Sequence, residues 1–333
     1  MTRFLFLRIG PPETDFRFAL AEALQALGHE VAYLYLGKRP RCLELGDDAR
    51  PRPMSRLAAL RWLSARKRRQ DVVFNATDLA FPLSLPWLKR WLGGVWVFDL
   101  HDDLRYGGGL RADIALRKKV ALHDLTVCAA PNLVDLVPGA IHLGNASDLR
   151  PSSAEKSQSR ILVIASLDSR FDFAFLTQAA QKSPGLTFDL YGHVANAQGE
   201  TARTLEKAIA HTPNIHHRGT YRTADLGRII AGYGVMLAPW RIRHPATHHI
   251  DPLRFHHALN AGLELLTTDI PAARLIADRC HIVDTPEAVG VLASGLQTGT
   301  IERRNVTGRG QLPTWSDRAR RLLALVDDHR RGR

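Results

Sequence analysis

Short apolar runs alternate with amphipathic helical patterns along almost all of the 333 residues. Strands that alternate with helices imply a parallel sheet covered by helices on both faces. The apolar runs predicted as strands in the first half are residues 4–9, 31–36, 72–74, 95–100, 125–128 and 141–143. The helical patterns between them are residues 16–27, 79–92, 110–122 and 132–137. The first half therefore predicts a doubly wound α/β domain.

The same alternation restarts after a polar stretch, residues 151–159, which is typical of a linker. The predicted strands of the second half are residues 161–165, 187–191, 215–217, 235–238, 263–267 and 281–283. Its predicted helices are residues 171–182, 201–211, 224–231, 253–261, 272–277 and 315–330. We expect domains at 1–150 and 160–333 that face each other across a cleft, with the last helix free to pack on the first domain. Ligands of such domains bind at the carboxyl ends of the strands.

The cysteines and the lengths of the apolar runs indicate which classes of protein this chain does not belong to. Cys42, Cys128 and Cys280 lie far apart without a CxxC pair, which argues against a disulfide framework or a zinc site and fits a reducing cytoplasm. The N-terminal apolar run is too short and too charged for a signal sequence, and no segment approaches the ~20 apolar residues of a membrane span. We therefore expect a cytoplasmic protein.

Positive charge is concentrated in residues 50–69, which hold eight Lys or Arg and no acid in a chain of net charge +12. Leu57, Leu60, Trp62 and Leu63 are spaced to share one face of a helix within this segment. A basic amphipathic helix with a Trp favours contact with an anionic membrane surface, here the inner membrane. A solvated basic helix and nucleic-acid contact are the alternatives. The residues predicted to contact the membrane are Arg61, Trp62, Arg66, Lys67, Arg68 and Arg69.

Residues 234–269 predict an anion site. An apolar strand is followed by a basic loop and by a short helix that opens at Asp251-Pro252 and stops at Gly262. Asp is a favoured cap and Pro a favoured first helical residue. Exposed N–H groups and the helix dipole attract anions at such a start, and Arg241 and Arg254 add fixed charge that suits a diphosphate.

Several short motifs occur in a characteristic order along the chain. In the second half they are LDSRFD at 167–172, FDLYG at 188–192, NIHHRG at 214–219, DPLR at 251–254, NAG at 260–262 and WSDRA at 315–319. In the first half they are VFDLHDDL at 97–104 and GNASD at 144–148. In this order they resemble the motifs of GT-B glycosyltransferases of bacterial polysaccharide and glycolipid assembly. DPLR resembles the family's "SPxK" signature, and VFDLHDDL resembles the "YDxxDD" strand end that faces the acceptor.

The resemblance implies two Rossmann-like domains and transfer of a sugar from a nucleotide donor, by default a UDP-sugar, to a lipid-linked or polysaccharide acceptor. The donor-side residues that it implies are Arg254, Arg241, Arg170, Tyr221, His193, Asp251, Leu253 and His257. Those implied on the acceptor side are Gly10, Asp103 and Tyr106. Asp102 resembles the base of an inverting group that makes glucuronosyl linkages, where a base takes the acceptor's hydroxyl proton. Alternatively, Asp102 and Asp103 cap the helix that follows them.

Two departures from the family pattern concern histidines. His249 and His257 occupy positions where many retaining members carry two glutamates, of which the later one commonly holds the donor ribose. Hence a catalytically inactive relative that binds a nucleotide sugar or a carbohydrate as a regulator is the alternative function. A basic nucleic-acid-binding protein is a third reading, but no recognisable module supports it. The histidines crowded at 244–257 lack an HExxH pattern or a cysteine partner, so we expect no metal and no cofactor.

Overall fold

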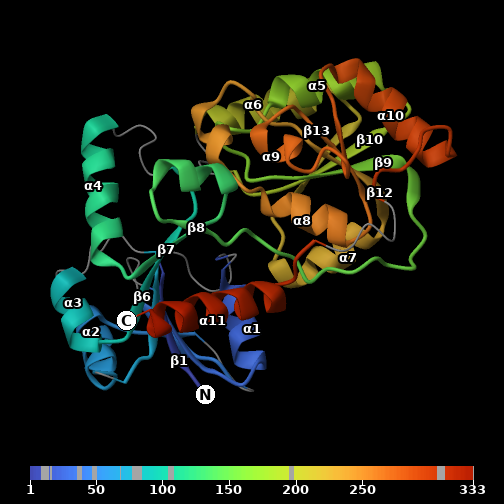
Figure 1. The fold of residues 1–333 in the computed structure, drawn as a ribbon. Helices are drawn as coiled ribbons and strands as arrows, with labels where there is room; N and C mark the ends of the chain where they lie inside the picture. The colour runs from blue at the N-terminus through green and yellow to red at the C-terminus, as the bar shows by residue number, and fades with distance from the viewer. Residues whose placement is uncertain are drawn as a thin grey trace. The chain divides into compact units, whose positions relative to one another are not determined.

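Two sheets organise the chain, each in its own unit of the structure (Figure 1). The first unit comprises Met1–Asn145 and Pro313–Arg333, and the second comprises Ala146–Leu312. Both sheets are largely parallel and carry helices, which confirms the predicted α/β class with two Rossmann-like domains. The computed structural model describes residues 1–8, 15, 17–35, 40–46, 51–67, 69–76, 85–103, 109–194, 199–305 and 312–332.

The first unit contains an eight-stranded sheet of order β4-β3-β2-β1-β5-β6-β7-β8. Its strands are β1 (Arg3–Arg8), β2 (Glu30–Tyr35), β3 (Arg41–Glu44), β4 (Arg52–Pro53), β5 (Val72–Asn75), β6 (Val95–Leu100), β7 (Leu125–Cys128) and β8 (Ile141–His142). Six strands run parallel, whereas β3 and β4 pair antiparallel at one edge. Its helices are α1 (Phe18–Ala26), α2 (Arg56–Ser64), α3 (Leu85–Leu92), α4 (Gly109–Leu122), the 3-10 helix η1 (Pro131–Leu136) and α11 (Trp315–Arg331).

Helices from distant parts of the chain close the first unit. Leu63 of α2 and Leu88 of α3 pack with the fully buried Trp96 of β6 in one apolar core. The C-terminal helix α11 packs against α1, so the last helix of the chain belongs to the first unit. Thr314 begins α11 with a capping box in which its hydroxyl oxygen accepts from the Asp317 N–H, while Asp317 accepts from the Thr314 N–H.

The second unit contains a six-stranded parallel sheet of order β11-β10-β9-β12-β13-β14. Its strands are β9 (Ser157–Ile164), β10 (Thr187–Tyr191), β11 (Ile215–Gly219), β12 (Tyr233–Ala238), β13 (Glu264–Thr267) and β14 (Cys280–Ile282). Its helices are α5 (Phe173–Lys182), α6 (Glu200–His211), η2 (Thr223–Asp225), α7 (Leu226–Ala231), η3 (Pro245–His249), α8 (Leu253–Asn260), α9 (Pro271–Arg274) and α10 (Pro286–Thr298). Helices α5, α6 and α10 cover one face, while α7 and α8 pack on the other (Figure 1).

The strand order of the second unit creates a topological switch point. From β9 the chain moves outward through β10 to β11, and it then returns to the other side of β9 for β12, β13 and β14. The loops after β9 and β12 therefore leave the same edge of the sheet in opposite directions. Such a crevice, outside the carboxyl ends of the strands, is where open α/β sheets bind ligands.

Three local predictions differ from the structure. Residues 132–137 were expected to form an α-helix, but the structure has the 3-10 helix η1, which starts at a proline. The edge strand β4 and its neighbour β3 were not predicted, because they are only two and four residues long and carry no apolar run. Residues 151–159 do not form a free linker, since β9 already begins at Ser157.

A buried charge network lies beside the carboxyl end of β6. The carboxylate of Asp99 accepts from Arg8 Nη1 at 2.7 Å and lies 3.2 Å from Arg17 Nη2 and 2.9 Å from His101 Nε2. Arg8 also donates to Asp15 from Nε at 2.6 Å. Burial alone would raise the pKa of Asp99, but the neighbouring charges lower it well below its ordinary value, and Arg17 has the largest effect among them. Both arginines are held by carboxylates, so the network stabilises the fold rather than waiting for a ligand.

We expect Asp99→Asn to lower the free energy of unfolding by about 3 kcal/mol, because it leaves buried arginines short of a countercharge. The folded-state pKa of Asp99 lies below its unfolded value of about 3.9, so its contribution is present above that pH and is lost as the pH falls. Urea denaturation at pH 7 and at pH 3.5 measures both effects. Asp71→Asn is the control, since its pair with Arg3 is partly exposed and is worth under about 1 kcal/mol. Equal losses in the two variants would contradict a special role for Asp99.

Candidate functional site

The loops after β9 and β12 are joined by backbone hydrogen bonds at the switch point. The Arg241 N–H donates to the Arg170 carbonyl oxygen at 2.9 Å, and the Asp172 N–H donates to the Pro239 carbonyl oxygen at 3.2 Å. Between them, residues 171 and 240 form an antiparallel bridge. This pairing fixes the backbone on both sides of the crevice, so the side chains of the two loops have defined positions.

Arg254, in the first turn of α8, lies at the centre of the site. Its guanidinium carbon is 4.2 Å from the centroid of the Trp240 ring, a cation–π contact. Arg254 Nη1 and Trp240 Nε1 are both buried, and neither has a hydrogen-bond partner among the described residues. Burial lowers the pKa of Arg254 to about 10, which leaves it charged at neutral pH.

Asp168 and Arg170 form an ion pair on the loop after β9. Arg170 Nη2 lies 2.6 Å from Asp168 Oδ2, and the Arg170 N–H donates to Asp168 Oδ1 at 2.9 Å. Burial opposes ionisation of Asp168, but the hydrogen bond from Arg170 lowers its pKa overall. Because this pair is neutral as a unit, the charge of Arg254 remains uncompensated at the crevice.

Unpartnered buried N–H groups indicate a ligand, because a buried donor without an acceptor costs free energy in the empty protein. Arg254 and Trp240, which are in cation–π contact, each have one such donor. The first turn of α8 adds backbone N–H groups and the positive end of its dipole. This arrangement suits the oxygens of a phosphate or diphosphate, and it stabilises negative charge that develops on them.

The start of α8 differs by one residue from the prediction. Pro252 is the N-cap rather than the first helical residue, and it has no side chain that can cap the helix. The carboxylate of Asp251 lies 2.8 Å from His256 Nε2, so this side chain reaches into the second turn of the helix. The predicted stop is confirmed: Gly262 has φ +76°, and a Cβ there would lie 3.3 Å from Pro151.

His257 is held by a buried serine. Ser147 Oγ lies 2.8 Å from His257 Nδ1 and also accepts from the Leu149 N–H at 3.3 Å. Since Ser147 is fully buried, its hydroxyl proton has His257 Nδ1 as its acceptor, which places the ring proton on Nε2. Burial lowers the pKa of His257 to about 3, so the ring is neutral. The neutral donor Nε2–H of His257 therefore occupies the position where the family resemblance implied a carboxylate.

The other donor-side residues predicted from the sequence vary in their positions. Tyr221 is half-buried against the core under α8, where burial raises its pKa, and its hydroxyl interacts electrostatically with Arg254. Leu253 is the first residue of α8. The side chains of His193 and Arg241 are exposed, and no contact joins them to Arg254.

The acceptor-side predictions fall in the first unit. Asp102 is exposed and Asp103 half-buried on the segment that leaves β6, immediately after the Asp99 network. Gly10 and Tyr106 lie outside the described residues. The structure therefore places the proposed base at the carboxyl edge of the first sheet, where a doubly wound domain presents functional groups.

The predicted basic helix is present as α2, which Ser55 caps by accepting from the Ala58 N–H at 3.1 Å. Its apolar face was placed incorrectly in part, because Leu57 is 60% exposed while Leu63 is buried. Arg66 stacks on Trp62 at 3.5 Å and pairs with Glu44, so these two side chains are partly used within the unit. The side chains of Arg61, Lys67 and Arg69 are exposed, and Arg68 lies outside the described residues.

The described ranges contain neither a cluster of metal-ligating side chains nor a membrane-spanning helix. In these ranges, no group of three or more His, Cys, Asp or Glu side chains is arranged to hold a metal ion. No helix in them combines the length and the apolar character needed to cross a membrane.

Comparison with known proteins identifies the fold. No protein-family model and no curated protein matches the sequence. Sucrose-phosphate synthase from Thermosynechococcus elongatus matches the structure with a TM-score of 0.72 at 12% identity, over 100% of both chains. Anabaena HepE in complex with UDP-glucose matches with a TM-score of 0.65 at 12% identity, over 100% of this chain and 98% of HepE.

The crystal structure of TarM matches with a TM-score of 0.60 at 9% identity, over 86% of this chain. The match covers 64% of TarM, so this chain spans less than two thirds of the length of that relative. The chain has the GT-B fold. In a GT-B protein the second Rossmann-like domain carries the switch-point crevice described above, and Arg254 belongs to that domain.

Sequence reasoning missed three residues of the site. Asp168 and Trp240 were not singled out, although each lies in the loop after a predicted strand, residues 161–165 and 235–238. Ser147 was part of a recognised motif, but its contact with His257 depends on a fold that brings distant residues together. A search for polar or aromatic residues just after each predicted strand would have found the first two.

We expect Arg254→Met to abolish binding of inorganic pyrophosphate without lowering the melting temperature of the free protein. Methionine keeps most of the apolar contact with Trp240 and removes a buried charge that lacks a partner. Thermal denaturation with and without pyrophosphate measures both effects. Arg243→Gln, on the loop after β12 and exposed, is the control and should keep the ligand-induced shift. An undiminished shift in Arg254→Met would remove Arg254 from the anion site.

Proposed function

We propose that this protein is a glycosyltransferase that moves a sugar, a hexose or a glucuronate, from a UDP-sugar to a lipid-linked or polysaccharide acceptor. The observation that carries the proposal is Arg254, a cation whose buried Nη1 has no hydrogen-bond partner among the described residues, at the switch point of a GT-B fold. The diphosphate of a nucleotide sugar supplies acceptor oxygens of the required charge. Support comes also from HepE, solved with UDP-glucose, and from S. aureus TarM, solved with UDP and fondaparinux.

The proposed reaction is a single displacement. The acceptor's hydroxyl oxygen attacks the anomeric carbon as the bond from that carbon to the diphosphate oxygen breaks, and the electron pair leaves with the nucleoside diphosphate. Asp102 takes the hydroxyl proton. Arg254 and the first turn of α8 stabilise the charge on the leaving diphosphate, so we propose that no metal is required. The anomeric configuration inverts.

We expect Asp102→Asn to reduce kcat by at least about 100-fold, the smaller end of what a general base contributes. Binding of UDP should be unchanged, because Arg254 belongs to a different unit of the structure. Release of UDP from a panel of UDP-sugars in the presence of acceptor measures turnover, with EDTA present to test metal independence. Asp103→Asn is the control and should lose less than about tenfold. Wild-type turnover in Asp102→Asn would exclude Asp102 as the base.

A catalytically inactive regulator is the second candidate, and His257 is the observation that favours it. In a neutral imidazole held by Ser147, Nε2–H can only donate a hydrogen bond, so it cannot accept one from a ribose hydroxyl as a carboxylate does. The two candidates differ in one measurement. Binding of UDP-sugar without release of UDP, across acceptors that bind, would support the regulator.

We also propose that the first unit docks on an anionic membrane surface, where a lipid-linked acceptor is available. Exposed apolar side chains occur on three of its helices: Leu57 of α2, Trp87 of α3, and Leu110 and Ile114 of α4. Basic residues accompany them on the same helices, as in interfacial helices. These features support a membrane surface over nucleic acid, which does not need exposed apolar groups.

Lys67→Gln/Arg69→Gln should weaken binding to vesicles of anionic phospholipid by about 2 kcal/mol, or roughly 30-fold, at about 1 kcal/mol for each basic residue near the surface. Co-sedimentation at low and high salt measures it, and salt should weaken wild-type binding too. Lys207→Gln/Arg222→Gln removes the same charge from the second unit and should have little effect. Equal effects of the two double variants would contradict docking by the first unit.

A further inference from the structure

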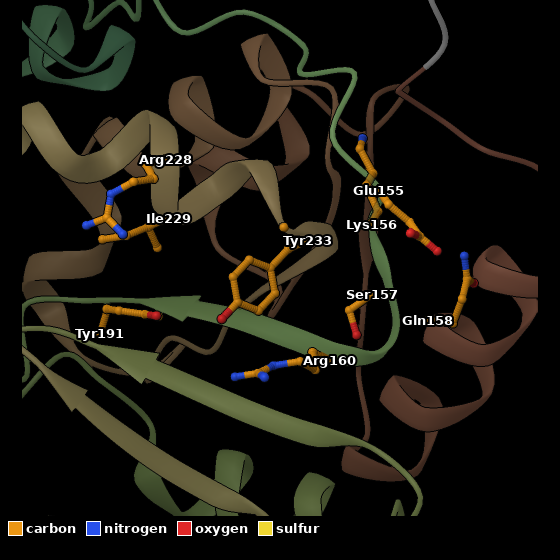
Figure 2. Close-up of a pocket in the computed structure, with 10 residues that line it drawn as sticks. Glu155, Lys156, Ser157, Gln158, Arg160, Tyr191, Arg228, Ile229 and Tyr233 are labelled. Carbon is orange, nitrogen blue, oxygen red and sulfur yellow. The ribbon is translucent and has the colours of Figure 1, made fainter.

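A polar pocket of about 530 Å3 opens on the face of the second sheet beside α7 (Figure 2). Arg160 of β9, Tyr191 of β10 and Tyr233 of β12 line it from the sheet, while Arg228 and Ile229 line it from α7 (Figure 2). The pocket extends from the starts of β9 and β12 to Tyr191 at the end of β10, and its lining residues include neither Arg254, Trp240 nor Asp168. It is therefore separate from the nucleotide-sugar site.

A buried carboxylate organises the sheet side of this pocket. Asp189, fully buried in the middle of β10, accepts from Arg160 Nε at 2.6 Å, from Arg218 Nε at 2.7 Å and from the Tyr233 hydroxyl at 2.8 Å. Parallel strands covered on both faces are normally continuous apolar runs. Asp189 therefore departs from this apolar pattern. It lies between two arginines, one from each neighbouring strand, and the parallel sheet does not require it.

The two arginines keep hydrogen-bonding capacity beyond Asp189. Arg218 bonds to this carboxylate through Nε, while Arg160 bonds to it through Nε and Nη2 and also to the side chain of Tyr233. Both Nη atoms of Arg218 have no partner among the described residues. The side chains are 41% and 39% exposed, so a ligand can reach them. Asp189 holds both guanidinium groups in place without using their outer edges.

The charge around the pocket is positive. Asp189 neutralises only one of the two arginines that it holds. Lys156 and Arg228 line the pocket as further cations, and Glu155 is the acid among the lining residues (Figure 2). Arg228 Nη2 lies 3.6 Å from Asp225 Oδ1, a weak exposed pair. Guanidinium groups with free edges bind carboxylate and phosphate oxygens with defined geometry.

We propose that this pocket binds an acidic monosaccharide, a sugar that carries a carboxylate or a phosphate group. The volume fits a sugar-sized ligand, while the polar lining does not suit an apolar one. The oxyanion binds the partly exposed Arg160 together with Arg228, and the sugar ring packs on the half-buried side chains of Tyr191 and Ile229. This site is additional to the proposed donor site and does not depend on it.

Isothermal titration calorimetry with glucuronate, glucose 6-phosphate and glucose tests the proposal. At least one of the two acidic sugars should bind, at least about tenfold more tightly than glucose, because only they offer an oxyanion to the arginines. Which of them binds identifies the carboxylate or the phosphate as the recognised group. Binding of neither, or equal binding of glucose, overturns the proposal.

Arg228→Gln should weaken that binding about tenfold, through loss of a charged contact. Arg222→Gln is a matched control: Arg222 is equally exposed and also pairs with Asp225, but it does not line the pocket. Both variants change the surface only, so both should fold. Equal weakening by the two variants overturns the proposal, because it would reflect net charge alone.

Arg254→Met separates this site from the donor site. The variant should still bind the acidic sugar with wild-type affinity, and loss of that binding would place the sugar in the donor site and overturn the proposal. UDP titrations test the proposed function independently. A protein that binds glucuronate but not UDP upholds the second site and removes the proposed donor.

Discussion

The site in the second unit depends on the backbone pairing between the loops after β9 and β12. Without the hydrogen bonds that link Arg170 to Arg241 and Asp172 to Pro239, the indole of Trp240 would have no fixed place beneath Arg254. The pairing is possible because the strand order puts β9 next to β12. Topology therefore positions a charge that the local sequence alone does not place.

The arginines Arg8 and Arg254, one in each unit, differ in whether carboxylates neutralise their charge. Arg8 in the first unit is enclosed by Asp15 and Asp99, which raise its pKa despite burial. Arg254 in the second unit has an aromatic ring below it and no carboxylate bonded to it among the described residues, and burial lowers its pKa. The first arrangement is complete in the free protein. The second becomes complete only when an anion arrives.

The sequence predicted the fold more fully than the site, for a physical reason. Buried parallel strands are continuous apolar runs, so β6 and β12 were visible in the sequence, as was the glycine that ends α8. The antiparallel edge strands β3 and β4 carry no such run. Arg254 was found because charge at a helix start is a local pattern. Trp240 and Ser147 were missed because their contacts, with Arg254 and with His257, depend on the fold. Asp168 pairs with Arg170 only two positions away, so it was a local pattern that sequence reasoning overlooked.

The return of the last helix to the first unit has a consequence for synthesis on the ribosome. Helix α11, whose buried residues include Leu322 and Val326, packs against α1 near the beginning of the chain. The whole second unit emerges from the exit tunnel before α11 does. The second unit, which is one unbroken segment, can therefore finish folding while the first still exposes the apolar side of α1. The domain made first is thus the domain completed last, and it is the one that nascent-chain chaperones would need to shield.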